Sequence, residues 1–201
     1  MPEIAIPTPP SIDVGHLTGR KPTIRNLLRE ATAPDHKRLD GLLAALDLQR
    51  ITGYRRFLEI NASALLPLER ALVAGGVSKL MPDWKRRART EAIRADLAAV
   101  GGTARPLAQP NLDTRFDLLG TLYVLEGSRL GAAYLIRSVQ RSAEPRVRCA
   151  TAYLGHGAGL KLWPSFVSVL EGYADMLADP DEIVQPAKRA FDLFIEAVAQ
   201  P

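Results

Sequence analysis

Apolar residues recur every three or four positions along most of the chain, which is the spacing of amphipathic helices. In the segment 23–45, for instance, Leu27, Leu28, Ala31 and Leu39 fall on one side of a helix. Alternating runs rich in Val, which would indicate strands, are nearly absent. The pattern therefore predicts an all-α fold, a single-domain bundle of six to seven helices.

Glycine and proline residues separate the predicted helices. These helices cover residues 23–45, 52–73, 83–100, 113–141 and 145–154, followed by one that begins near Trp163 and a last one over 180–198. The glycine-rich segment 155–159 is expected to form a loop between two of them.

Three positions in this pattern predict where helices begin or break. Pro34 interrupts the first helix, and Thr32 with Asp35 resembles a capping box. We therefore expect a kink or a restart of the helix at this point. Thr52 and Asp113 are the expected N-caps of the second and fourth helices.

Residues 1–20 lack the helical pattern and contain four prolines. We expect them to form a flexible N-terminal arm, followed by a helical domain over residues 21–201. The arm has no basic stretch followed by an apolar run, so a secretory signal is not expected. No segment approaches the roughly 20 apolar residues that a transmembrane helix needs, so no membrane association is expected.

The composition is that of an ordinary globular protein, with 47% hydrophobic and 24% charged residues. Cys149 is the single cysteine, which excludes an intramolecular disulfide and favours a cytoplasmic location. The net charge of +4 is mildly basic. Because the basic residues are scattered, we expect no nucleic-acid partner.

His36 is the histidine of this chain that lies on a predicted helix among regularly spaced apolar residues. Asp40 follows one turn later and is placed to accept the imidazole Nδ1–H, which would leave Nε2 free as a metal ligand. The alternative is that His36 and Asp40 form an ordinary surface pair of a histidine and an acidic residue, which is common on helices. A zinc site is not expected, because a structural zinc needs about four ligands. One histidine is compatible with haem, whose porphyrin supplies four nitrogens.

The predicted fourth helix contains Gly120, Gly127 and Gly131. Each glycine costs roughly 1 kcal/mol relative to alanine in a helix interior, so three in one helix need a reason. At about 100° per residue they lie on one stripe. Either another helix packs closely against this stripe, or a flat ligand lies on the bare backbone.

Three segments together resemble bacterial biliverdin-producing haem oxygenases, including the type associated with bacteriophytochromes. The first is LREATAPDHKRLD at 28–40, which is similar to the family's proximal helix. The second is GTLYVLEGSRLGAAYL at 120–135, which is similar to its distal helix. The third, TAYLGHGAGLKLWPSFVSVLE at 151–171, resembles the family's glycine-rich loop and the helix after it.

The resemblance implies that haem b, which is both cofactor and substrate, lies between the first and fourth helices. It implies that His36 is the axial iron ligand, supported by Asp40. It also implies oxidative cleavage of haem to biliverdin, carbon monoxide and ferrous iron. The implied partners are O2 and an external electron donor, either a ferredoxin or a flavoprotein reductase. A bilin-binding photoreceptor is a further implied partner.

Other residues take their implied roles from the same resemblance. Gly127, Ser128 and Gly131 would lie at the side of the haem where oxygen binds. Arg29 and Tyr123 match positions that contact the haem propionates, and Arg137 is a further candidate for that contact. Arg129 lies about 160° from the glycine stripe and is expected to point away from the haem.

Two positions depart from the family pattern. Animal-type members have an aspartate where this chain has Ser128, and a second glycine often stands where this chain has Ala132. The methyl group of Ala132 is expected to narrow the oxygen-binding side. These departures leave open a non-catalytic haem-binding or carrier protein of the same fold. Also open are a haem-free helical protein with His36 on its surface, and a basic adaptor module.

Overall fold

The computed structural model describes residues 23–200, and the regular elements in that range are all helical. The elements in chain order are α1 (Ile24–Leu43), α2 (Ile51–Ala74), η1 (Val77–Lys79), α3 (Trp84–Arg87), α4 (Thr90–Val100), α5 (Arg115–Val139), α6 (Pro145–Cys149), α7 (Leu162–Glu171), η2 (Ala174–Met176) and α8 (Asp181–Ala199). Six of the α-helices have ten or more residues, so the predicted all-α bundle is confirmed. The predicted arm, residues 1–20, lies outside the described residues.

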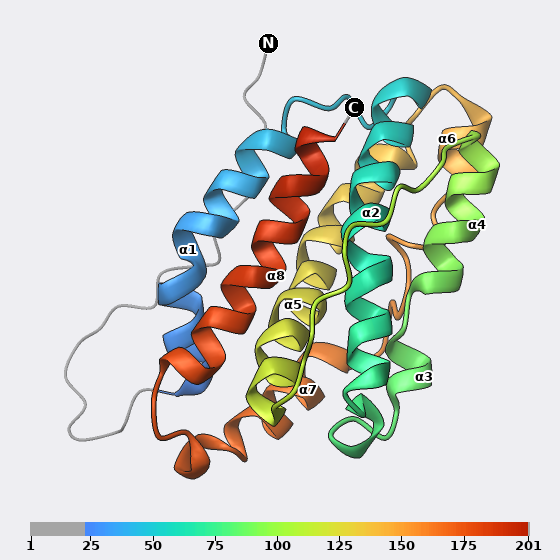
Figure 1. Ribbon diagram of the computed structural model, residues 1–201. Helices are drawn as coiled ribbons and strands as arrows, with labels where there is room; N and C mark the ends of the chain where they lie inside the picture. The colour runs from blue at the N-terminus through green and yellow to red at the C-terminus, as the bar shows by residue number, and fades with distance from the viewer. Residues whose placement is uncertain (1–22, 201) are drawn as a thin grey trace, which may run out of the picture.

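The long helices stand side by side, with α8 between α1 and α5 (Figure 1). α1, α5 and α8 all begin at the same end of the bundle, whereas α2 runs in the opposite direction (Figure 1). α8 packs against α1, α2 and α5, and α4 packs against the far side of α2. Between residues 23 and 200, no helix combines the length and the apolar character that crossing a bilayer requires.

The hydrophobic core is centred on α2 and α8. Most residues of α2 from Phe57 to Leu72 are buried, and α8 contributes a buried stripe that includes Ile183, Phe191 and Phe194. α8 buries one stripe of an amphipathic helix, whereas α2 is buried on all sides over residues 60–69. Burial of these two helices supplies most of the driving force for the bundle.

α1 continues through Pro34 without a break, so the predicted restart is wrong, and the predicted kink stays a prediction. Proline removes the hydrogen bond to the carbonyl of Glu30, but both residues are exposed and water can bind that carbonyl instead. Thr32 does not act as a cap, because its hydroxyl donates to the carbonyl of Leu28 at 2.7 Å.

The structure also corrects two predicted N-caps. α5 is capped by Thr114 rather than Asp113, in a capping box with Asp117. α2 begins one residue before Thr52, and its first backbone N–H, that of Ile51, donates to the carboxylate of Glu144 at 3.1 Å. A carboxylate from far along the chain thus replaces the local cap.

Two predicted helices are shorter in the structure. The segment 83–100 divides into α3 and α4, because the backbone becomes extended at Ala88 and the Glu69 carboxylate accepts hydrogen bonds from the backbone of Arg89 and Thr90. The segment 145–154 is helical only to Cys149. Beyond it, the Asp96 carboxylate binds the backbone N–H groups of residues 152 and 153 and stabilises a turn.

Candidate functional site

The imidazole of His36 is oriented by its neighbour on α1 and remains accessible. Its Nδ1 lies 2.9 Å from Oδ2 of Asp40, and 62% of its side chain is exposed. The hydrogen bond to Asp40 raises the pKa of His36. The edge of the Phe191 ring on α8 lies beside the imidazole, with the ring centroids 5.9 Å apart. The expected contact between His36 and Asp40 is therefore confirmed, and it assigns the free ring nitrogen as Nε2.

The face of α1 that carries His36 is turned toward α5. Arg25 and Arg29 lie within about 20° of His36 on the helix. Burial raises the pKa of Tyr123 on α5, whereas the hydroxyl of Thr32 and the charges of Arg25 and Arg29 lower it. Because these α1 residues act on a side chain of α5, the same face of α1 looks across to α5.

His36 and Gly127 hold equivalent positions along their helices. Each is twelve residues beyond the first residue of its helix, which corresponds to a rise of about 18 Å. α1 and α5 begin at the same end of the bundle (Figure 1), and Thr32 acts on Tyr123 across the two helices, each of them one turn before His36 and Gly127 respectively.

The three glycines of α5 have different surroundings. A Cβ atom on Gly120 would lie 2.5 Å from the Ile183 carbonyl oxygen, so this glycine permits close packing of α5 against α8. A Cβ atom on Gly131 would meet nothing within 4 Å. At Gly127 the nearest atom is a ring carbon of Trp163 at 3.6 Å. Close packing against another helix therefore explains Gly120, whereas a flat ligand on the backbone at Gly127 and Gly131 stays a prediction.

The open part of α5 is apolar. Leu130 and Tyr134 lie within about 60° of Gly127 on the helix, and both are exposed, Leu130 by 58% and Tyr134 by 39%. We call Gly127, Leu130, Gly131 and Tyr134 the glycine face of α5. Exposed apolar surface of this kind is typical of a binding site for an apolar ligand.

Aromatic side chains close one end of the glycine face. Trp163, at the start of α7, packs against Tyr123 and Phe166, with ring centroids 5.8 Å apart in each case. The sequence predicts a helix beginning near Trp163 but does not place its ring beside Gly127. That placement depends on the packing of α7 against α5.

The structure brings together some of the predicted site residues and separates others. Arg29 of α1 lies near enough to Tyr123 of α5 for its charge to lower the pKa of that residue. Arg137 lies about 15 Å farther along the helix axis than Gly127, toward the end of α5. Ala132 is buried in the core, so the expectation that its methyl group narrows the glycine face is wrong.

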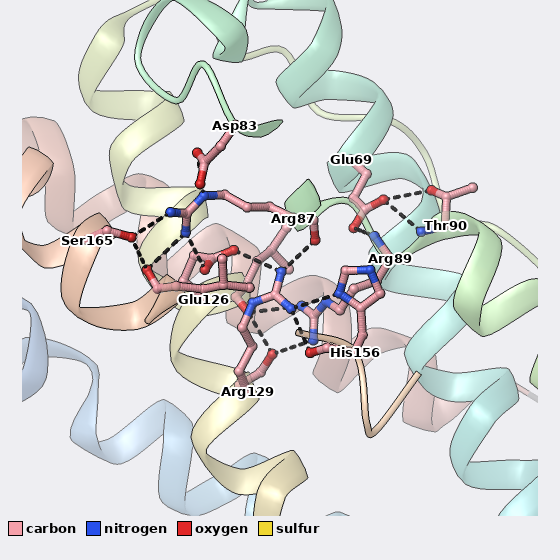
Figure 2. A network of polar contacts seen from close by, with 12 residues as sticks. Glu69, Asp83, Arg87, Arg89, Thr90, Glu126, Arg129, His156 and Ser165 are labelled. Carbon is pink, nitrogen blue, oxygen red and sulfur yellow. Dashed lines mark hydrogen bonds and ion pairs between the residues drawn. The ribbon is translucent and has the colours of Figure 1, made fainter. Parts of the chain in front are cut away.

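The side of α5 away from the glycine face is held by a network of buried charged residues (Figure 2). Arg87, which is 1% exposed, donates to Asp83, Glu126, Ser165 and the Leu162 carbonyl.

Arg129 donates to Glu126, to the Arg87 carbonyl and to the His156 carbonyl, and its Nη1 lies 3.2 Å from Nδ1 of His156. As expected, Arg129 points away from the glycine face. Burial lowers the pKa of Arg129, with the charges of Arg89 and Arg87 acting in the same direction.

This network is not among the features predicted from the sequence. Two signals in the sequence point to it. Glu126 follows Leu119 and Leu122 at helical spacing, and Arg87 follows Trp84 by three positions. Charged residues at such core positions need a buried partner.

Ser128 takes part in the same set of contacts. Its hydroxyl donates to the Leu125 carbonyl at 2.8 Å and accepts from Nη1 of Arg89 at 3.0 Å. The side chain is therefore directed toward α4 rather than along the glycine face. Its predicted part in catalysis stays a prediction.

Comparisons with known proteins identify the family and the fold. The family model described as heme oxygenase matches residues 23–200. Heme oxygenase PigA of Pseudomonas aeruginosa is 29% identical over 172 residues, which cover 81% of this chain and 83% of PigA. A crystal structure of the NO- and CO-bound heme oxygenase from Neisseria meningitidis has a similar fold, with a TM-score of 0.66 and 22% identity over 88% of this chain and 90% of that one. With most of its length matched by the family model, this chain belongs to the haem oxygenase family.

Proposed function

We propose that this protein binds haem b between α1 and α5 and cleaves it oxidatively to biliverdin, carbon monoxide and ferrous iron. The observation that carries the proposal is the accessible Nε2 of His36, which is oriented by Asp40 and lies on the face of α1 that acts on Tyr123 of α5. Membership of the haem oxygenase family supports it. In this proposal O2 is the oxidant, and an external ferredoxin or flavoprotein reductase supplies electrons.

The residues present fit a haem. Nε2 of His36 is free to bind the iron, and Asp40 holds the Nδ1 proton and the ring orientation. The bare backbone at Gly131, with exposed Leu130 and Tyr134, accommodates a flat apolar ring. When bound, haem supplies the iron centre at which oxygen is activated.

The cations of α1 near Tyr123 fit the two haem propionates. Arg29 and Tyr123 are the candidates for this contact, and Arg25 lies on the same face of α1. Their position at one edge would orient the ring in its plane. Arg137 is the candidate for a contact at the opposite end.

On the side of the haem where oxygen would bind, the protein presents the backbone of α5 and not a charged side chain. Gly127 and Gly131 let the helix approach the ligand, while Arg129 is directed away to Glu126. We propose that Gly127, Ser128 and Gly131 together shape this side and exclude bulk water from it.

Haem titration of a His36→Ala variant tests the proposal. We expect the variant to lose the histidine-ligated Soret spectrum, and added imidazole to restore it. Asp40→Asn should bind haem about 10–100-fold more weakly, because the ligand loses its orienting partner. The exposed neighbour variant Lys37→Ala should behave as the wild type. An unchanged spectrum in His36→Ala would exclude this residue as the ligand.

Turnover distinguishes the enzyme from a carrier. Wild-type protein loaded with haem should lose its Soret band and form biliverdin when an electron donor and O2 are added. A stable Soret band without biliverdin would reject the enzyme and leave a haem-binding protein, the alternative that the engagement of Ser128 by Arg89 favours.

A further inference from the structure

The guanidinium of Arg89 is attached to α5 on either side of Gly127. Nη2 donates to the Leu125 carbonyl at 2.9 Å, and Nη1 donates to the Ser128 hydroxyl at 3.0 Å. The Ser128 hydroxyl in turn donates to the same Leu125 carbonyl at 2.8 Å. Arg89 comes directly before α4 and is 2% exposed. Its neighbour Glu126 takes no part in these contacts and binds Arg87 and Arg129 instead (Figure 2).

These contacts are made next to Gly127, where α5 bends more easily than at a residue with a side chain. In a regular helix the Leu125 carbonyl accepts one hydrogen bond, from the backbone of residue 129. Here it receives two further donors, and side-chain donors that insert at a helical carbonyl tilt it outward and bend the helix. Gly127, with no side chain to pack, offers little resistance to such a bend.

Arg89 is itself fixed to the rest of the bundle. Its backbone N–H donates to the Glu69 carboxylate of α2 at 2.7 Å. Its guanidinium lies over the ring of Tyr153, 5.2 Å from the centroid, and the hydroxyl of Tyr153 donates to Asn61 at 3.0 Å. The side chain therefore ties the backbone of α5 to the position of α2.

Among the described residues, no carboxylate pairs with the guanidinium of Arg89. The acceptors of the Arg89 guanidinium are a carbonyl and a hydroxyl, and its buried Nε has no hydrogen-bond partner. A buried cation without a carboxylate partner costs free energy. What these contacts of Arg89 do fix is the position of the α5 backbone at Leu125 and Ser128.

We propose that Arg89 is a positioning residue that sets how closely α5 approaches a ligand on its glycine face. Leu125 lies about 160° and Ser128 about 100° from Gly127 on the helix, so Arg89 acts from behind and does not touch the ligand. The inference rests on the proposed function, because the ligand in question is the haem.

Variants of Arg89 test the inference in two ways. Arg89→Met removes both donors, and Arg89→Lys keeps the charge but loses the paired geometry. Ser128→Ala removes one of the donors to Leu125. Arg94→Met is the matched control, because Arg94 is on α4 but exposed and pairs only with Glu91.

The first measurement is amide hydrogen exchange in the haem-free protein. We expect exchange at residues 127–133 to be about tenfold faster in Arg89→Met, with a smaller effect in Arg89→Lys and Ser128→Ala, and no change in α1. Exchange that matches the wild type in all three variants would overturn the proposal. If Arg89→Met fails to fold, the other two variants decide.

The second measurement is the C–O stretching band of carbon monoxide bound to the haem-loaded ferrous protein. We expect Arg89→Met and Arg89→Lys to bind haem through His36 as before, but to show a shifted or divided C–O band. A single band at the wild-type position in both would overturn the proposal. A wild type that binds no haem would instead reject the proposed function, and hydrogen exchange would still decide whether Arg89 fixes α5.

Discussion

Gly120 and Gly131 lie on the same stripe of α5 but serve different purposes. The stripe passes from the packed interface with α8, where a Cβ atom would collide with the Ile183 backbone, to open space at Gly131. Periodicity alone cannot separate these cases, because both residues have the same angular position on the helix. Because Gly120 is covered and Gly131 is open, alanine substitutions at the two positions should have different effects.

Gly131→Ala should stabilise the haem-free protein by up to about 1 kcal/mol, because alanine favours the helix and its methyl group meets no atom. The same methyl group should weaken haem binding by about 1–3 kcal/mol, since the ring would have to move away from the backbone. Thermal unfolding and haem titration measure the two effects.

Gly120→Ala is the comparison variant. We expect it to lose about 1–3 kcal/mol of stability from the collision with α8, while folded protein keeps the wild-type haem spectrum. Equal haem affinity of Gly131→Ala and wild type would contradict a ligand on the glycine face.

At the scale of elements, the position of α1 depends on a residue from the far part of the chain. The Glu171 carboxylate, at the end of α7, accepts hydrogen bonds from the backbone N–H groups of Ile24 at 3.0 Å and Arg25 at 2.9 Å. A negative charge at this end is also favourable for the helix dipole. The helix that carries His36 is thus held at its first turn.

Glu171→Gln should destabilise the protein by about 1–3 kcal/mol, because an amide cannot replace both carboxylate acceptors. Hydrogen exchange at residues 24–30 should become faster than elsewhere in the bundle. Glu196→Gln, an exposed position on α8, is the control. Uniform exchange rates along α1 in both variants would show that Glu171 does not hold the helix end.

At the scale of the whole molecule, buried ion pairs connect segments that are far apart in the chain. Arg87 joins α3 to α5 through Glu126 and to α7 through Ser165 (Figure 2). Its hydrogen bond to Asp83 lowers the pKa of that carboxyl group. Because the folded-state pKa is lowered, this pair stabilises the protein at neutral pH and loses its effect in acid.

Asp83→Asn should therefore be less stable than the wild type at neutral pH, by roughly 1 kcal/mol. The difference should shrink as the pH falls through 3.8, the ordinary pKa of the group, toward the lower folded-state value. Urea unfolding of the haem-free proteins at about pH 3 to 7 measures this. Asp175→Asn, which alters an exposed aspartate, is the control. Parallel stability curves for Asp83→Asn and the wild type would contradict the assignment.

Features that depend on residues within one helical turn of each other are predicted well from the sequence. Hydrophobic spacing is enough for the all-α fold and for most helix positions, because burial of one stripe decides each helix. The contact between His36 and Asp40 is of the same kind, since residues four apart always face each other on a helix. The glycine stripe is likewise a property of the helix alone.

Only the tertiary structure decided the contacts between segments that are far apart in the chain. Sequence reasoning missed the helix ends that Glu69 and Glu144 stabilise, because these partners come from other helices. It also missed the burial of Arg87 and Arg89, whose guanidinium groups bind residues of α5 that lie 36 or more positions away. The packing of α8 decided which glycine is covered and which is open. Local sequence determines the helices and their faces, but the side chains that meet across the bundle determine where a ligand can lie.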